Sequence, residues 1–277
     1  MSLLMVVLTS ALFAGLVATC ATVAVERLGG KLGGVLATTP STIIAAAAGV
    51  FIASPTEEAF QSAMSATPSG MLLNALFLWL WRLLPPHLPK WGLGARLAMM
   101  TTLSLSAWLL GAFGVVTVLA PIRAAGDIRT LLWIGAGVTA TVITLGLITS
   151  RDAATPSSPP RPVPLGVLLA RGLFAAMAVS VAVIWSRLGG PLAAGMASVF
   201  PVIFLTTMVS LWLSQGEAVQ SGAVGSMMLG STAVSAFALT AAFALPAYGV
   251  VAGCALGWLA AVCFVSLPAA AWVRRGR

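Results

Sequence analysis

Long apolar runs separated by short polar stretches occupy most of the chain. A helix needs about 20 apolar residues to cross the roughly 30 Å hydrocarbon core of a bilayer, and the runs have that length. The first run lacks the basic residues that begin a signal peptide, so we take it as a membrane helix. We therefore predict about nine transmembrane helices, at residues 3–25, 32–53, 59–84, 96–120, 130–150, 165–185, 192–214, 218–245 and 248–273.

Composition places the chain among membrane proteins. Sixty per cent of its residues are hydrophobic and 7% are charged, whereas soluble domains carry about 25% charged residues. A chain with so few charges cannot cover itself with a polar surface, so the fold class we predict is an all-α polytopic membrane protein. The net charge is +8, but the basic residues sit singly in loops and at the C-terminus. That pattern is typical of cytoplasmic loops and does not indicate a nucleic-acid partner.

Several short motifs occur twice, in the same order and about 160 residues apart. Arg27 begins an Arg-Leu-Gly-Gly run that recurs at Arg187, and Glu58 begins a Glu-Ala-Phe-Gln-Ser run that recurs with one change at Glu217. An internal repeat in an apolar chain is typical of secondary transporters. The fifth span has no counterpart, so we predict four helices (1–120), a linker helix with a Pro- and Ser-rich loop (121–164), and four helices (165–277). Because five spans separate the starts of the two copies, the predicted repeat is inverted.

The basic residues also predict the orientation in the membrane. With the N-terminus outside, eleven of the 14 Lys and Arg residues fall in cytoplasmic segments, and three fall outside: Arg123, Arg129 and Arg187. We therefore expect the N-terminus outside and the C-terminus in the cytoplasm. The short polar tails favour a bacterial inner (plasma) membrane.

Two further features concern the predicted cytoplasmic side. Arg171 lies roughly 9 Å into the sixth span by helical rise. We expect its long side chain to snorkel to the headgroups, with an anion site as the alternative. Trp79, Trp81 and Trp91 flank a basic stretch and predict an aromatic belt at this interface.

Hydroxyl side chains gather around prolines inside two predicted spans, at residues 38–42 and 67–70. Ser or Thr before Pro is typical of a helix start, so each segment predicts a break whose free N–H groups would face a polar or anionic group. Equivalent hydroxyls occur in the second copy, and Asn74 is a carboxamide well inside a span. The alternative is that the hydroxyls bond carbonyls of their own helices and the prolines only kink them. Asn74 would then bind a neighbouring helix. The candidate substrate-binding residues are Thr38, Thr39, Ser41, Thr67, Ser69, Asn74, Ser198, Ser226 and Ser231.

Two glutamates at equivalent positions are candidates for coupling or gating. Glu58 lies at the outer mouth of one predicted span and Glu217 at the inner mouth of another. Carboxylates there could load protons, or they could pair across the repeats, Arg187 with Glu58 and Arg27 with Glu217. The alternative is that both glutamates only stabilise helix N-termini.

The sequence offers little for catalysis. His87 is the only histidine and lies in a Pro-rich loop, and no nucleophile-elbow or zinc-protease motif is present. The three cysteines lie in apolar runs without metal-binding spacing. We expect no enzyme activity, no cofactor and no metal. We predict a secondary transporter that moves a small polar or anionic organic solute by alternating access, with protons as the candidate coupling ion and membrane lipid as its surroundings. The alternative is a non-transporting membrane subunit or assembly factor.

Overall fold

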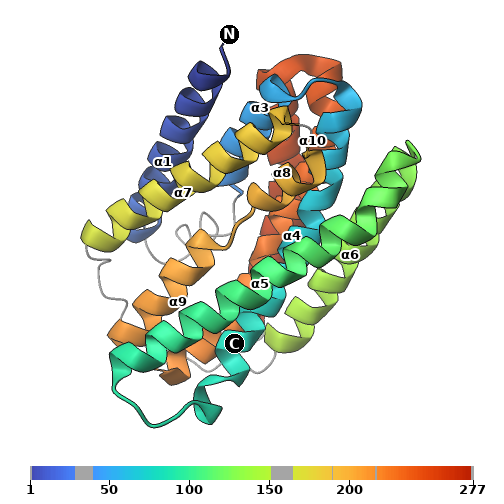
Figure 1. Ribbon diagram of the computed structural model, residues 1–277. Helices are drawn as coiled ribbons and strands as arrows, with labels where there is room; N and C mark the ends of the chain where they lie inside the picture. Colours follow the sequence, from blue (N-terminus) through green and yellow to red (C-terminus); the bar gives the residue numbers. More distant parts are fainter. Residues whose placement is uncertain (1, 29–39, 151–164, 189, 216, 276–277) are drawn as a thin grey trace.

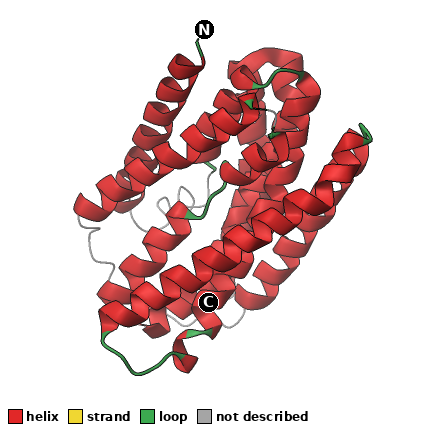
Figure 2. Cartoon of the chain, in the orientation of Figure 1, coloured by secondary structure: helices red, strands yellow, loops and turns green. Residues whose placement is uncertain are grey.

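The computed structural model describes residues 2–28, 40–150, 165–188, 190–215 and 217–275, and within these ranges every regular element is a helix (Figure 1, Figure 2). A 3₁₀ turn (Pro85–His87) and a π turn (Val262–Ser266) complete the order. The α-helices are α1 (Leu3–Leu28), α3 (Thr42–Ala53), α4 (Glu57–Leu83), α5 (Leu93–Ala124), α6 (Ile128–Ser150), α7 (Leu165–Arg187), α8 (Pro191–Ala197), α9 (Val202–Gln215), α10 (Glu217–Ala261) and α11 (Leu267–Arg275).

Seven helical segments in the described part of the chain are long and apolar enough to cross a membrane. They include Pro191–Leu213, which joins α8 and α9, and the 49-residue segment Val224–Trp272. The shorter helix α3 is also apolar but has only 12 residues. The prediction of an all-α membrane protein is therefore confirmed.

Helix α4 lies at the centre of the bundle and is packed by α5, α6, α8 and α10 (Figure 1). Small residues let its neighbours approach the backbone closely. Gly135 of α6 lies against the Ser65 carbonyl, and Gly195 of α8 lies against the Ala63 carbonyl. Glycine at these contacts is typical of helix packing in membranes. The result is a core helix with little surface left for lipid.

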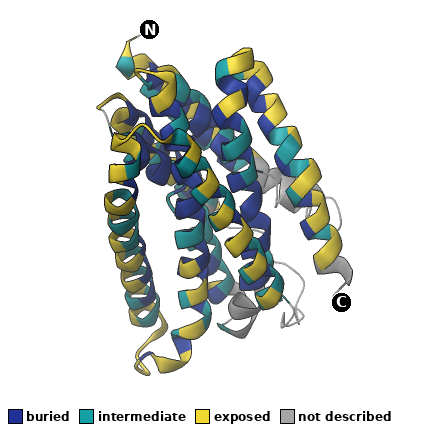
Figure 3. Cartoon of the chain, turned by 90° about the vertical axis from the view of Figure 1, so that its right-hand side faces the viewer, coloured by how far each residue is buried: buried dark blue, intermediate teal, exposed yellow. Residues whose placement is uncertain are grey.

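Exposed apolar side chains cover the outside of the bundle (Figure 3). On α5, for example, Leu110 is 74% and Phe113 71% exposed. In water such a surface would be unfavourable, but in a bilayer it faces lipid tails of the same polarity. α1 and α7 lie side by side along one flank and meet where Gly15 contacts the Gly172 carbonyl (Figure 1).

The long helix α10 contains a reversal at Gly249, whose φ of 76° and ψ of 175° are not helical. Residues before and after this glycine then meet in antiparallel order: Leu245 contacts Gly253, and Phe237 contacts Gly257. A positive φ suits glycine because it has no Cβ. The segment is therefore a helical hairpin.

The predicted break at Thr67–Gly70 is wrong, because α4 continues through Pro68 without interruption. A proline removes one backbone hydrogen bond, but a helix packed on several sides tolerates that loss. Gly135 of α6 lies directly against Pro68 here. The equivalent segment of the second copy, around Ser226, also lies within a continuous helix, α10.

The other predicted break has a different outcome in each copy. In the second copy the helix ends at Ala197 and starts again at Val202, on either side of residues 198–201. In the first copy α3 begins at Thr42, directly after Pro40 and Ser41. Residues 29–39, directly before Pro40, lie outside the described ranges.

Two ends of the bundle matter for the site. The start of α4, the end of α5 and the start of α6 form the Glu58 end, where Glu58 and Arg123 line one pocket. The start of α10 lies at the opposite Glu217 end, because Gly225 of α10 contacts Ser150 at the end of α6. α5 therefore carries Arg96 near the Glu217 end and Arg123 near the Glu58 end.

Candidate functional site

The break between α8 and α9 is buried within the bundle. Val199 and Pro201 are buried, and Ser198 and Phe200 are half-buried. Tight turns carry the chain across: Val199 N–H bonds Met196 O at 3.2 Å and Phe200 N–H bonds Ala197 O at 3.1 Å. Such a break leaves backbone groups without helical partners, and in a membrane these must be satisfied by protein.

Asn74 of α4 supplies one of those partners. Its Nδ2 donates to the Val199 carbonyl at 2.8 Å, while its Oδ1 accepts a hydrogen bond from Trp108 Nε1 of α5 at 2.8 Å. Trp108 also packs edge-on against Phe200, with ring centroids 5.2 Å apart. Gly70 lies one turn earlier on α4, in contact with Val199. Asn74 thus links three elements at the break, as the interhelical alternative predicted.

Three of the six predicted hydroxyl residues in the described ranges bond carbonyls one turn earlier along the chain. Thr67 Oγ1 donates to Ala63 O, Ser198 Oγ to Gly195 O, and Ser231 Oγ to Met228 O. Ser69 is buried and Ser226 half-buried. Ser41 is half-buried and makes no side-chain cap. The structure brings the turn of Asn74 together with the break after Ser198, while Ser226 lies on the stretch of α10 that packs against α6. Thr38 and Thr39 lie outside the described ranges.

Arg171 of α7 points into the bundle, so the prediction that it snorkels to the headgroups is wrong. The residue is 9% exposed. Its Nε donates to Thr206 Oγ1 and its Nη2 to Thr207 Oγ1, both at 3.1 Å. Two hydroxyls on the facing turn of α9 satisfy guanidinium donors inside the protein, which makes the longer reach to water unnecessary. Arg171 therefore ties α7 to the half-helix after the break.

An ion pair links two helices at the Glu217 end. Arg96 Nη2 lies 3.1 Å from Glu217 Oε2 and also donates to the Pro85 carbonyl at 2.7 Å. The guanidinium lies over Trp212 of α9, 5.6 Å from the ring centroid. Trp212 in turn packs edge-on against Trp81. Charge, hydrogen bond and cation–π contact thus join the starts of α5 and α10 with α9 and the α4–α5 connection.

Trp81 is buried in this cluster, so its predicted place in an interfacial belt is wrong. It is 0% exposed, whereas Trp79 is 40% and Trp91 57% exposed. All three tryptophans lie near the same end of the bundle, but Trp81 faces inward from α4 onto Trp212. The contact with a second aromatic ring favours burial over the interface.

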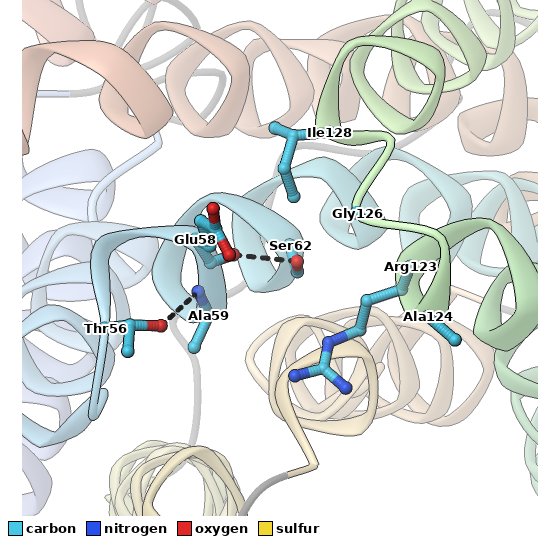
Figure 4. Close-up of a pocket in the computed structure, with 8 residues that line it drawn as sticks. All are labelled: Thr56, Glu58, Ala59, Ser62, Arg123, Ala124, Gly126 and Ile128. Atoms are coloured by element: carbon cyan, nitrogen blue, oxygen red, sulfur yellow. Dashed lines mark hydrogen bonds between the residues drawn. The ribbon is translucent and has the colours of Figure 1, made fainter.

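A pocket of about 230 Å³ opens at the Glu58 end (Figure 4). Glu58 comes from the first turn of α4, and Arg123 comes from the last turn of α5 on the opposite wall. The remaining lining residues are small, carry hydroxyls or, in one case, are aliphatic: Thr56, Ala59, Ser62, Ala124, Gly126 and Ile128. The two charges therefore face one space from different helices.

Local structure explains how these groups are held. Thr56 caps α4 by accepting the Ala59 N–H at 3.1 Å, and Glu57 Oε1 accepts a hydrogen bond from Gln61. Gly126, with a φ of 72°, turns the chain between α5 and α6. Asp127 then caps α6 by accepting the Thr130 N–H at 2.9 Å. Hydrogen bonds from the Thr130 side chain and backbone, and then the charge of Arg129, lower the pKa of Asp127.

Apolar side chains close the space one turn deeper than this pocket. Ala66 follows Ser62 by one turn, Leu119 precedes Arg123 by one turn, and Leu131 follows Ile128. These three form a buried cluster with Leu192 of α8. The pocket therefore ends at a closed apolar layer.

The pairs expected from the repeat are not the pairs that this conformation contains. Glu217 binds Arg96, and the side chain of Arg27 is outside the described residues. Glu58 and Arg187 are both exposed and make no ion pair within the described part of the chain. Sequence reasoning missed Arg96 and Arg123. Arg96 is predicted on the same side of the membrane as Glu217, and Arg123 on the same side as Glu58. Only the path of α5 brings each arginine near that glutamate.

Within the described ranges, no three His, Cys, Asp or Glu side chains gather as a metal ion would need. Comparison with family models, curated proteins and solved structures found no match to this chain.

Proposed function

We propose that this protein is a secondary transporter, which moves a small polar or anionic organic solute by alternating access between two inverted repeats. The observation that carries the proposal is the buried break between α8 and α9. Discontinuous helices at membrane depth are typical of transporter binding sites, because unwound backbone is tolerated there only where it is buried in protein or lines a cavity. A non-transporting subunit or assembly factor has no need of one.

The seven segments would give nine membrane crossings if Val224–Trp272 counts as two and α3 counts as one more. The segment Val224–Trp272 reverses at Gly249, so it would cross twice. The predicted span at residues 32–53, of which α3 is the described part, would provide a further crossing. Four helices would then precede the linker helix α6 and four would follow it.

The two helix starts that follow prolines support the inverted relation of the repeats. α3 starts after Pro40 and runs toward the Glu58 end, and α9 starts after Pro201 and runs toward the Glu217 end. The half-helices thus leave the interior in opposite directions, as inverted copies should. The N-terminal end of each carries the positive end of its helix dipole. A carboxylate or another anionic group is the ligand that such ends favour.

In this interpretation the conformation described is closed at both ends. The Arg96–Glu217 pair with Trp212 would close the Glu217 end, and the layer of Leu119, Leu131 and Leu192 would close the Glu58 end. Opening one closure at a time would expose the break to one side of the membrane. Breaking the Arg96–Glu217 pair would open this closure, and protons are the candidate coupling ion. Arg27 and Arg187 would then be the cross-repeat partners of Glu217 and Glu58 as the halves rock.

The positive-inside bias would place the Glu58 end outside and the Glu217 end in the cytoplasm of a bacterial cell. The solute would therefore meet the Glu58 pocket from the outside.

The direct test is flux. The purified protein would be reconstituted in liposomes, and uptake of carboxylate-bearing solutes would be followed with and without an imposed pH gradient. We expect saturable uptake of at least one solute, driven by the gradient and no longer pH-dependent in Glu217→Gln. Protein-free liposomes and Lys90→Gln, an exposed charge change near the same end, are the controls. Uptake no greater than in protein-free liposomes for every solute would favour the subunit alternative.

A further inference from the structure

The pocket at the Glu58 end carries one negative and one positive group, and neither has a partner among the described residues. Glu57 is bound by Gln61, whereas the carboxylate of Glu58 accepts no hydrogen bond or ion pair within the described part of the chain. Arg123 is likewise unpaired there, and the two residues line the same space from different helices (Figure 4). An unpaired acid and base on opposite walls are a recognition pattern for a ligand that carries both complementary charges.

Size limits this ligand. The space is about 230 Å³, below the roughly 300–1,000 Å³ typical of sites for drug-sized molecules. The apolar part of the lining is Ala59, Ala124 and Ile128, which leaves room for a short aliphatic group. A molecule of a few heavy atoms fits these dimensions.

Charge limits it further. A ligand with a carboxylate alone would bind Arg123 but approach the like charge of Glu58, and a ligand with an ammonium alone would meet the reverse problem. A zwitterion satisfies both walls, because guanidinium binds carboxylate in a fork of two hydrogen bonds and carboxylate accepts from ammonium. Asp127 does not line the pocket, and the neighbouring charge of Arg129 offsets its own, so it changes this balance little.

We propose that the pocket lined by Glu58 and Arg123 binds a small zwitterion with a carboxylate and an ammonium group, such as an α-amino acid. Arg123 holds the carboxylate, Glu58 holds the ammonium, and the side chain lies against Ala124 and Ile128. The inference rests on the proposed function for its role in transport, as the site where the solute first contacts the protein from outside. Binding itself does not depend on transport.

Protection of a single cysteine tests this binding. In full-length protein lacking Cys20, Cys254 and Cys263, Ala124→Cys places one thiol on the pocket wall, and its reaction with a charged methanethiosulfonate is timed. The probes are L-alanine, propionate, which lacks the ammonium, and alaninamide, which lacks the carboxylate. At about ten times its dissociation constant, L-alanine should slow the reaction about tenfold. The other two should have little effect.

Charge variants should change which probe protects. In Glu58→Gln the pocket keeps Arg123 alone, so propionate should gain protection and L-alanine should lose it. In Arg123→Gln alaninamide should gain protection instead. Glu57→Gln, on the same turn as Glu58, and Arg129→Gln, on the first turn of α6 at the same end, are matched controls, and they should keep the preference for L-alanine. A gain of protection requires folded protein, so a misfolded variant cannot imitate it.

Three results would overturn the proposal: no protection by L-alanine, equal protection by all three probes, or the same change of preference in the controls. Its failure is distinct from failure of the transporter. Flux without protection would reject this pocket only. Protection by L-alanine without flux of any solute would leave the pocket standing and reject transport.

Discussion

Replacing Asn74 with leucine should destabilise the protein by disconnecting the α8–α9 break from α4 and α5. Leucine has the same number of side-chain heavy atoms and the same branching as asparagine, but it has no polar atoms. The variant would lose the bond to the Val199 carbonyl and the bond from Trp108 Nε1. Both partners are buried, with Trp108 4% and Val199 7% exposed. Neither group can turn to water, so each would stay unsatisfied.

The magnitude follows from the two bonds. Hydrogen bonds between membrane helices contribute about 0.6 kcal/mol on average and about 1.7 at most. Two of them give about 1–3 kcal/mol. Unsatisfied buried groups in soluble proteins cost about 1–3 kcal/mol each, so the upper part of that range is expected for a site as buried as this one.

The assay is reversible unfolding in mixed micelles with increasing denaturing detergent, followed by circular dichroism. Trp108→Phe removes the indole donor, and the double variant completes a thermodynamic cycle. We expect Asn74→Leu and Trp108→Phe to be less than additive, since they share a bond. Trp133→Phe, at a tryptophan that is 72% exposed, is the matched control and should have little effect. A loss below about 0.3 kcal/mol for Asn74→Leu, or strict additivity in the cycle, would refute the reasoning.

Three other predictions concern packing, the ion pair and pH. Gly195→Ala should lower stability by about 1–3 kcal/mol, because the added Cβ would meet the Ala63 carbonyl. Gly114→Ala should not lower stability, because the space around Gly114 is open. The same detergent titration measures both variants. Arg96→Gln should lower the free energy of unfolding by at most about 1 kcal/mol in that titration, as expected for a partly exposed pair. The same variant should speed proteolysis or thiol labelling at the Glu217 end. The control Lys90→Gln should change neither. Because hydrogen bonds lower the pKa of Asp127 below its ordinary value of 3.8, the stability from this cap is complete above that pH and is lost as the pH falls further, through the pKa of the folded state. In thermal unfolding at graded pH, Asp127→Asn should remove this dependence, and an unchanged acid profile would contradict the assignment.

The helix positions could be predicted because burial in lipid imposes a length and a polarity on each run. The fifth span was expected at residues 130–150, and α6 covers Ile128–Ser150. The reversal at Gly249 is the second residue of the last predicted span, 248–273, next to the predicted boundary at residues 246–247. These features depend on local composition, which one sequence contains in full.

The wrong predictions depended on neighbours that are distant in sequence. Pro68 resembles a helix breaker until α6 and α8 are seen to pack around α4. Arg171 resembles a snorkelling residue until two threonines on α9 face it. Tryptophan is typical of membrane interfaces, but Trp81 packs against Trp212 in the interior.

The candidate site was predicted in part for the same reason. The break near Pro201 was visible in the repeat of Ser, Thr and Pro, and the glutamates were visible in the duplicated Glu-Ala motif. Arg96, which pairs with Glu217, and Arg123, which lines the same pocket as Glu58, lie on one helix whose tilt across the bundle is a tertiary property. Sequence spacing carries no information about that tilt.

Alternating access is the central claim, and two-sided labelling at the break tests it most directly. Ser198→Cys, without the three native cysteines, would be placed in vesicles of known orientation, and a membrane-impermeant thiol reagent would be added to one side at a time. With Arg96 intact, we expect slow labelling from the cytoplasmic side. With Arg96→Gln, labelling from that side should accelerate while labelling from outside stays slow. If the thiol reacts from neither side in both proteins, or from both sides at once, the break is not an alternately exposed site and the account is contradicted.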